Sequence, residues 1–301
     1  MRKYSDLLNK YHLKPEKYDI KGKVTIISTD NGRFVIKEKN RNNDTKIYKY
    51  LESRNFSYYP SIISDNEDDY YITEYIEQLP MPEEQKMFDL IDLVALLHNK
   101  TTHFKEVDED DYKKIYEDIV NNVEYLYSYY NDLISIIETK VYMSPAEYLI
   151  ARNISKIFAS LNYCKNTIDS WYESVKEKRK KRLVVLHNNL DLSHFIRNSS
   201  SYLINWDKAK IDMPIFDLYK LYKKTALDFD FYEILKRYES SYKLLNEEKT
   251  LLFILIALPD KIELSKNEFK DCKHISKSID MLYKTENLIS QYYTKDRKQN
   301  T

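Results

Sequence analysis

The pattern of apolar and polar positions changes character near residue 80. Before that point, short runs rich in β-branched and aromatic residues predict strands at 23–29, 33–39, 58–63 and 70–76. An Asp-Asn-Gly turn between the first two runs predicts a hairpin, and a polar helix is expected at 43–53. The first part of the chain therefore reads as a small antiparallel sheet with one helix.

Beyond the two prolines of segment 78–85, apolar residues recur at helical spacing. Ser144, Pro145 and Glu147 have the pattern of a capping box, which predicts a helix from there to about residue 178. The run RLVVLHNNL (182–190) predicts a short strand that leads into a loop, and FIRNSSSYLINW (195–206) predicts a hairpin. The expected fold class is α+β with two lobes, a β-rich lobe at 1–78 and a mostly helical lobe at 79–301.

Composition narrows the classes of partner. Lys and Arg together number 48, as do Asp and Glu, so the formal net charge is zero and we expect neither nucleic acid nor membrane as a partner. No apolar run is long enough to span a bilayer, and the two cysteines have no metal or redox spacing, so a reduced cytoplasmic protein is expected. The basic run at 176–182 has no interleaved aromatic residues and reads as a solvated helix end.

Candidate chemistry is concentrated after the predicted strand that ends at His187. The segment His-Asn-Asn-Leu-Asp-Leu-Ser-His occupies 187–194, followed by Ile-Asn-Trp-Asp at 204–207 and Pro-Ile-Phe-Asp-Leu at 214–218. Phosphoryl-transfer enzymes need a loop that supplies a base, a hairpin that supplies a metal-binding carboxylate and a lysine on a strand. The order and spacing of these segments fit that plan.

With these segments, the chain resembles the aminoglycoside phosphotransferase and choline kinase group, which has a protein-kinase-like fold. Within that group it is most similar to the spore-coat kinase-like proteins of Gram-positive bacteria. The group's pattern is H-G-D-x-x-x-x-N, then I-D-W-(D/E), then P-x-x-D-L. The resemblance implies an ATP site in which Lys37 contacts phosphate and Glu74, Tyr75 and Ile76 form the hinge beside the adenine. It also implies an acidic partner for Lys37, for which Asp44 is the first candidate and Glu52 the second.

The departures from the pattern concern three separate chemical tasks. Asn189 stands where the group has its catalytic Asp, His194 where it has a metal-binding Asn, and Asn205 where it has a metal-binding Asp. An amide accepts no proton from a hydroxyl near neutral pH, and Mg²⁺ prefers anionic oxygen ligands. We therefore expect weak or absent Mg²⁺ binding and a pseudokinase with a binding or scaffold role, for a protein partner and in a spore-coat setting by resemblance.

Two alternatives stay open at this point. Asp191 and Asp207 lie two residues after Asn189 and Asn205, and shifted carboxylates could serve as base and metal ligand, because i and i+2 share a face in an extended segment. The protein would then be an active ATP-dependent phosphotransferase of a small-molecule acceptor. The other alternative is a nucleotide-binding sensor that needs no metal.

Overall fold

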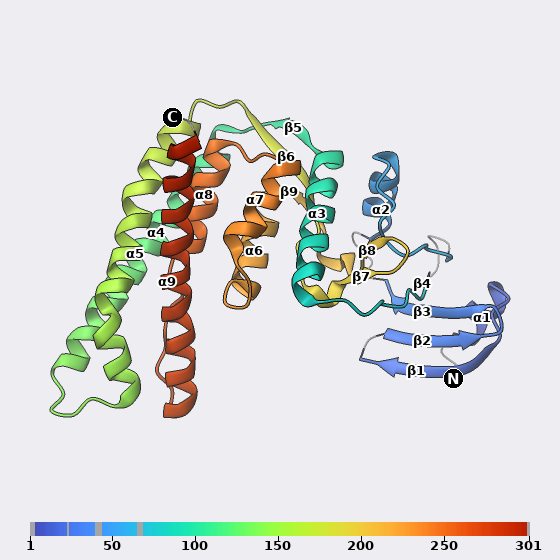
Figure 1. Ribbon diagram of the computed structural model, residues 1–301, viewed down its shortest axis with the longest axis horizontal. Coiled ribbons are helices and arrows are strands. Elements are labelled where there is room, and N and C mark those ends of the chain that lie inside the picture. The colour runs from blue at the N-terminus through green and yellow to red at the C-terminus, as the bar shows by residue number, and fades with distance from the viewer. Residues whose placement is uncertain (1–3, 23, 40–43, 65–68, 300–301) are drawn as a thin grey trace. The chain divides into compact units, whose positions relative to one another are not determined.

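The computed structural model describes residues 4–22, 24–39, 44–64 and 69–299. The chain forms two compact units (Figure 1). Unit 1 comprises Met1–Thr101 and Val185–Ile211, and unit 2 comprises Thr102–Val184 and Asp212–Thr301. Compact units and functional lobes are different divisions of a chain, so the predicted lobes at 1–78 and 79–301 stay a prediction.

Unit 1 contains an antiparallel sheet of four strands in sequence order. The strands are β1 (Pro15–Lys21), β2 (Val24–Thr29), β3 (Gly32–Glu38) and β4 (Tyr70–Glu74). Three predicted strands, at 23–29, 33–39 and 70–76, are confirmed as β2, β3 and β4, and so is the turn between β2 and β3. Strand β4 ends two residues early, at Glu74, and residue 23 lies outside the described residues. The strand predicted at 58–63 is wrong, since Ile62 forms only an isolated bridge with Thr73. Pro60 lacks the backbone N–H that a ladder requires, which explains the failure.

The two faces of the sheet have different neighbours. Ile27, Ile36 and Ile72 are fully buried and form a core with Leu8 of helix α1 (Ser5–Lys10) and with Leu13. Because successive strand residues point to opposite faces, burial of Ile36 sends the next residue, Lys37, to the other face. The helix and the edge strand β1 were not predicted, because β1 is charged along its length and mostly exposed.

Unit 1 also contains helices and a second hairpin. Helix α2 (Asp44–Ser53) follows the sheet's third strand, and helix α3 (Glu83–Thr101) buries a stripe that includes Leu90 and Val94. The predicted hairpin at 195–206 is confirmed as β7 (Phe195–Arg197) and β8 (Ser201–Leu203). Short 3₁₀ turns η2 (Leu192–His194) and η3 (Trp206–Lys208) flank this hairpin, and η2, β7 and β8 all contact α3.

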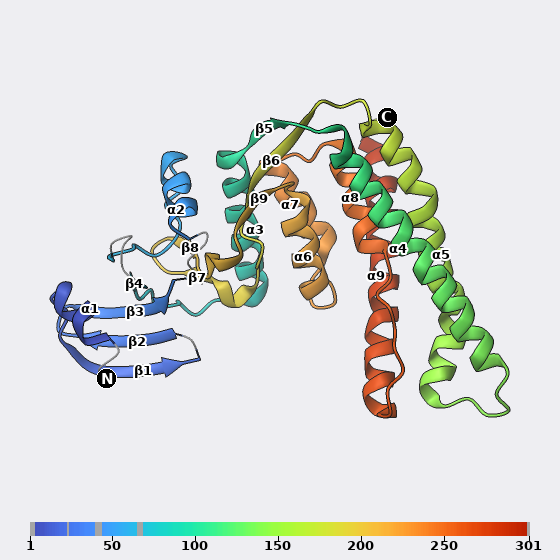
Figure 2. The same ribbon diagram turned by 180° about the vertical axis from the view of Figure 1, so that it is seen from behind.

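Unit 2 is built on long helices that run beside one another (Figures 1 and 2). Helix α5 (Pro145–Val175) packs against α4 (Glu109–Glu138), α8 (Asn246–Ala257) and α9 (Glu268–Gln299). Helices α6 (Ile215–Thr225) and α7 (Phe231–Ser241) also belong to this unit. The predicted capping box of α5 is confirmed: Glu147 N donates to Ser144 Oγ at 3.3 Å, and Ser144 N donates to Glu147 Oε2 at 2.9 Å.

A second sheet has the strand order β5-β6-β9. Strand β5 (His103–Glu106) pairs antiparallel with β6 (Lys180–Leu186), and β9 (Lys210–Asp212) is the third strand. Strand β6 confirms the run predicted before the loop, whereas β5 and β9 are too short to give a sequence signal. No helix among the described residues has the length and apolar character needed to cross a membrane.

Candidate functional site

A cavity of about 250 Å³ lies within unit 1, against the sheet face that bears Lys37. Three strands form one wall of the cavity. Each contributes two residues that are two positions apart, because alternate residues of a strand point to the same face of the sheet. Cross-strand partners meet there, because Val24 pairs with Lys37 and Lys37 pairs with Tyr71. The lining residues are Val24, Ile26, Val35, Lys37, Tyr48, Pro60, Tyr71, Thr73, Glu74, Tyr75, Ile76, Ile196, Ile204, Asn205, Trp206 and Asp207. The volume is close to the lower end of the range for small-molecule sites, roughly 300–1,000 Å³.

The ammonium group of Lys37 is held at this cavity by two oxygens from the end of the second hairpin. It donates to Asp207 Oδ2 at 2.5 Å and to Asn205 Oδ1 at 3.3 Å. The side chain of Lys37 is 23% exposed and that of Asp207 is 41% exposed, so solvent screens the ion pair in part. Lys37 therefore meets, at the cavity, an amide and a carboxylate that follow it by 168 and 170 residues in the chain.

The loop residues Asn189, Asp191 and His194 are brought together beside this hairpin but are not among the residues that line the cavity. Asp191 caps the turn η2, because Oδ1 accepts from Ser193 N at 2.9 Å and from Ser193 Oγ at 2.8 Å. His194 Nδ1 lies 2.8 Å from the carbonyl oxygen of Asn189. A carbonyl only accepts, so His194 carries its hydrogen on Nδ1. Two pairs of residues, Asp191 with Ser193 and His194 with Asn189, are thus hydrogen-bonded within the loop.

The asparagines at the start of the loop and at the hairpin end adopt left-handed backbone conformations that ordinarily favour glycine. Asn188 has φ +61° and Asn205 has φ +64°. Among residues with a side chain, Asn is one of the few that tolerate this region. Asn188 therefore adopts a backbone conformation open to glycine, at the position to which the sequence resemblance assigns glycine. Its side chain also donates to the carbonyl of Lys208 at 2.7 Å.

His187, at the start of the loop, contacts the end of the hairpin. It is fully buried, and Nε2 donates to the carbonyl oxygen of Ile204 at 2.8 Å. Its ring packs edge-on against Trp206, with ring centroids 4.9 Å apart. The indole of Trp206 is 3% exposed and donates to the carbonyl of Leu203 at 2.8 Å. These contacts fix the loop and the hairpin end to each other.

The predicted hinge residues are among those that line the cavity. Glu74 ends strand β4, and Tyr75 and Ile76 follow it; all three line the cavity. The backbone N–H of Tyr75 donates to the carbonyl of Arg33 at 3.0 Å, and the Arg33 guanidinium lies 4.3 Å from the Tyr75 ring centroid. Their assignment as an adenine hinge stays a prediction, although their position beside an apolar cavity is compatible with it.

The structure describes the side chain of one of the two acids considered as partners of Lys37. The side chain of Asp44 lies outside the described residues. Glu52 Oε1 instead accepts from the hydroxyl of Tyr59 at 3.2 Å. Burial, with a smaller contribution from the Glu52 charge, raises the pKa of Tyr59 well above its usual range. The carboxylate that pairs with Lys37 in the structure is Asp207.

Lys86 is a cation near the loop that the sequence did not single out. It lies in the first turn of α3, and partial burial lowers its pKa, while the charges of Glu83 and Asp191 act in the opposite direction. The interaction with Asp191 spans more than 100 residues, so no local pattern could have revealed it. Among the described residues, no group of three or more His, Cys, Asp or Glu side chains is placed to hold a metal ion. Mg²⁺ at a phosphate site needs only one or two carboxylates together with the phosphates, so this finding leaves such a site untested.

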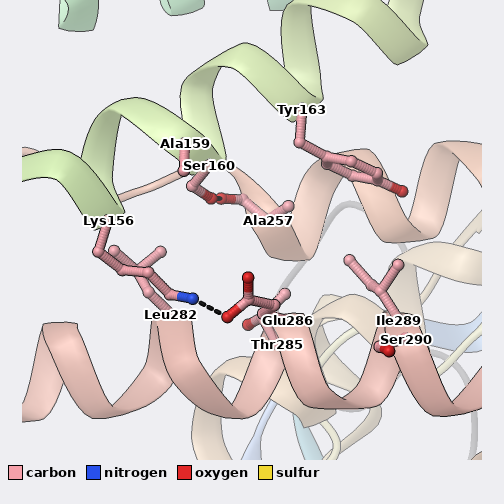
Figure 3. A pocket seen from close by; sticks show the side chains of 10 residues that line it. All are labelled: Lys156, Ala159, Ser160, Tyr163, Ala257, Leu282, Thr285, Glu286, Ile289 and Ser290. Atoms are coloured by element: carbon pink, nitrogen blue, oxygen red, sulfur yellow. Dashed lines mark hydrogen bonds and ion pairs between the residues drawn. The ribbon is translucent and has the colours of Figure 1, made fainter.

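A separate cavity of about 210 Å³ lies in unit 2, between α5 and α9 (Figure 3). Lys156 of α5 points toward Glu286 of α9 and forms an ion pair with it. Ser160 Oγ donates to the carbonyl of Ala257 at 2.5 Å. These polar groups are paired with each other, and the remaining walls are mainly apolar. The cavity in unit 1, with Lys37 and Asp207 at its wall, is therefore the better candidate for phosphate chemistry.

The comparisons with known proteins concern the fold. No protein-family model matches the sequence, and no curated protein matches it. The solved structures that match include an aminoglycoside phosphotransferase from Alicyclobacillus acidocaldarius, with 10% identity over 94% of both chains and a TM-score of 0.69. The AMP-bound spectinomycin phosphotransferase APH(9)-Ia matches with 14% identity, a TM-score of 0.55 and coverage of 94% of this chain and 97% of that one. A putative aminoglycoside phosphotransferase from Ralstonia eutropha matches with 12% identity over 95% and 98% of the chains and a TM-score of 0.51. The chain has the protein-kinase-like fold of the aminoglycoside phosphotransferases.

Proposed function

We propose that this kinase-fold protein binds an adenine nucleotide in the unit 1 cavity and is strongly impaired in phosphoryl transfer. The observation that carries the proposal is the position of Lys37. Its ammonium group lies at the wall of an apolar cavity, and the groups that hold it are the amide of Asn205 and the carboxylate of Asp207. A cation beside an apolar cavity suits a ligand with a flat apolar base and an anionic phosphate.

Support for a nucleotide ligand comes from two independent sources. The sheet wall of the cavity presents branched and aromatic side chains, including Val35 and Tyr71, against which a purine can pack. Spectinomycin phosphotransferase, which shares the fold, was solved with AMP and also with ADP and spectinomycin. We infer the same class of ligand for this chain.

The impairment is inferred from the chemistry of the loop. The Asn189 amide accepts no proton near neutral pH, so it cannot act as a general base. Asp191 is the carboxylate of the loop. It already accepts two hydrogen bonds from Ser193 and serves as a cap. A base must be within hydrogen-bond reach of the acceptor hydroxyl, and this cap directs the carboxylate toward its own turn.

The residues at the metal positions do not fit Mg²⁺ well. The Asn205 amide is neutral, and its Oδ1 is bonded to Lys37, whose positive charge repels a cation. His194 offers imidazole nitrogen, whereas Mg²⁺ prefers hard, anionic oxygen. We therefore expect a nucleotide to bind with little dependence on Mg²⁺.

A second candidate function is favoured by one observation. Asp207 lines the cavity next to Lys37, as a metal-binding carboxylate would. If a bound nucleotide draws Lys37 away, Asp207 becomes free to hold Mg²⁺, and the protein would be an active phosphotransferase of a small-molecule acceptor. A protein partner and a spore-coat setting rest on the sequence resemblance alone and remain predictions.

A thermal-shift titration with adenosine, AMP and ATP tests the proposal. We expect all three to raise the melting temperature, with AMP and ATP above adenosine because Lys37 contacts phosphate, and with no measurable ATP turnover. Absence of a shift with every ligand would contradict nucleotide binding and favour a scaffold without a ligand. ATP turnover that requires Mg²⁺ and is lost in Asp207→Ala would establish the second candidate.

A further inference from the structure

The basic run at 176–182 was expected to be a solvated helix end, but it extends from the end of α5 into the next strand. Helix α5 ends at Val175, so only the first residues of the run follow a helix C-terminus. Lys180, Lys181 and Arg182 instead begin the strand β6. Favourable interaction with a helix dipole is limited to the last turn, so it does not account for the strand cations.

These cations border a cavity of about 240 Å³ within unit 2. Aromatic side chains form part of its wall: Trp171 is 2% exposed, Tyr112 is 7% exposed, and their ring centroids lie 6.0 Å apart in an edge-on arrangement. The full lining is Phe104, Tyr112, Trp171, Val175, Lys178, Lys180, Lys181, Arg182, Met213, Leu245, Glu247, Glu248 and Leu251. The cavity thus combines an apolar, aromatic wall with a cluster of charges.

The charges around the cavity do not cancel. Four cations line it against two carboxylates, and both carboxylates are committed. Lys178 forms an ion pair with Glu247, and the Arg182 guanidinium binds Glu248, with Nε to Oε1 at 2.9 Å. Arg182 also donates to the carbonyl of Lys243 at 3.1 Å from each terminal nitrogen. Among the lining residues, Lys180 and Lys181 supply the excess positive charge, and of these two Lys180 stands opposite Glu106 in the strand register.

Lys181 is the cation best placed to meet a ligand. Its Nζ lies 6.0 Å from the ring centroid of Tyr112, on the cavity wall, and its side chain is half-buried. Among the side chains that the structure describes, no carboxylate forms an ion pair with Lys181. In the strand register it stands opposite Lys105, and like charges that face each other across two strands destabilise the sheet. Of this pair only Lys181 lines the cavity, and an anion bound to it there would offset part of the repulsion.

We propose that this unit 2 cavity binds an organic anion with an aromatic or apolar body. The anionic group pairs with Lys181, and the body packs against the rings of Trp171 and Tyr112. Charge-assisted hydrogen bonds are stronger than neutral ones, and a desolvated aromatic wall adds apolar burial, so both parts of the ligand are needed. The inference is independent of the nucleotide site, which lies in unit 1.

Tryptophan fluorescence separates the two sites. The chain has only two tryptophans, and Trp206 lines the unit 1 cavity whereas Trp171 lines this one. In the variant Trp206→Phe, selective tryptophan excitation therefore reports on Trp171 alone. Titration with phenyl phosphate is expected to change this emission saturably, at concentrations about tenfold lower than inorganic phosphate or phenol requires.

The test variant is Lys181→Gln, and the matched control is Lys273→Gln. Lys273 is an exposed lysine of α9 that does not line the cavity. We expect Lys181→Gln to weaken phenyl phosphate binding about tenfold and Lys273→Gln to leave it unchanged. Calorimetry on the otherwise unsubstituted protein repeats the comparison without altering either tryptophan. Equal affinity in the two lysine variants would overturn the proposal, and so would a signal that is lost in Trp206→Phe but retained in Trp171→Phe.

Discussion

The loop at 187–194 and the hairpin end at 204–207 differ in where their carboxylates are directed. Each segment has an asparagine followed two residues later by an aspartate. Asp191 of the loop accepts hydrogen bonds from the backbone N–H and the hydroxyl of Ser193, within its own turn. Asp207 of the hairpin end instead binds Lys37, on a strand far away in the sequence. The same spacing thus gives one carboxylate that shapes a loop and one that faces a cavity.

This difference bears on the idea that shifted carboxylates rescue catalysis. A carboxylate that caps a turn cannot leave it without a cost in stability, so Asp191 is poorly suited to act as a base. Asp207 is half-exposed and pairs with a lysine through an ion pair that solvent screens, so a phosphate group can compete with it. Variants at the two segments should therefore separate effects on stability from effects on ligand affinity.

The largest effect is expected from Lys37→Met. This change removes the cation at the cavity wall and should weaken ATP binding by about 2 kcal/mol, roughly thirtyfold, while adenosine affinity stays the same. Calorimetric titration measures both affinities. Lys17→Met, at an exposed position of β1, is the matched control. Unchanged ATP affinity in Lys37→Met would place the phosphates elsewhere.

The next effect is expected on stability, from Asp191→Ala. Loss of the cap at η2 should lower the free energy of unfolding by about 1 kcal/mol, as measured by urea denaturation. ATP affinity should not change, because Asp191 does not line the cavity. If instead the variant abolished a robust ATP turnover of the native protein, Asp191 would be the catalytic base and the contrast between the two segments would fail.

A smaller change in ATP affinity is expected from Asp207→Asn, in the opposite direction to that of Lys37→Met. Removal of this carboxylate releases Lys37 from a partly screened ion pair and should tighten ATP binding by less than about 1 kcal/mol in the absence of metal. Competition binding with a fluorescent nucleotide resolves such a change. A loss of affinity that is seen only with Mg²⁺ present would show that Asp207 is a metal ligand.

Asn189→Asp alone is expected to produce no measurable ATP turnover. The restored carboxylate stands in a loop whose metal positions, His194 and Asn205, remain unfavourable for Mg²⁺. A coupled assay of ADP release detects turnover down to slow rates. Turnover by this single variant, and not by Asn189→Ala, would mean that the metal positions are intact.

Much of the fold could be predicted from local patterns, because alternation and capping signals report on local structure. The capping box at Ser144 and Glu147 is an example, since every atom involved lies within one turn of helix. The strand prediction at 58–63 was wrong because it was based on apolar and aromatic composition. It did not take into account that Pro60 cannot donate a hydrogen bond to a strand ladder. Strand β1 gave no signal, since an exposed edge strand such as Pro15–Lys21 needs no apolar alternation.

The candidate site was harder to predict, because its contacts are long-range. The sequence suggested that Lys37 has an acidic partner on the following helix, but the described partner, Asp207, comes from the distant hairpin. The proximity of Lys86 to Asp191 depends in the same way on tertiary packing. The left-handed conformation of Asn188 is one that glycine adopts readily, and the sequence alone does not reveal it.

The effect of Mg²⁺ on ATP affinity tests the central claim most directly, because it needs no knowledge of an acceptor. Calorimetric titrations of the native protein with ATP should be carried out once with excess Mg²⁺ and once with a chelator. If the amides at 189 and 205 have removed the metal site, the two dissociation constants should agree within about threefold. Tightening by Mg²⁺ of about tenfold or more would contradict the account and identify a working metal-dependent kinase.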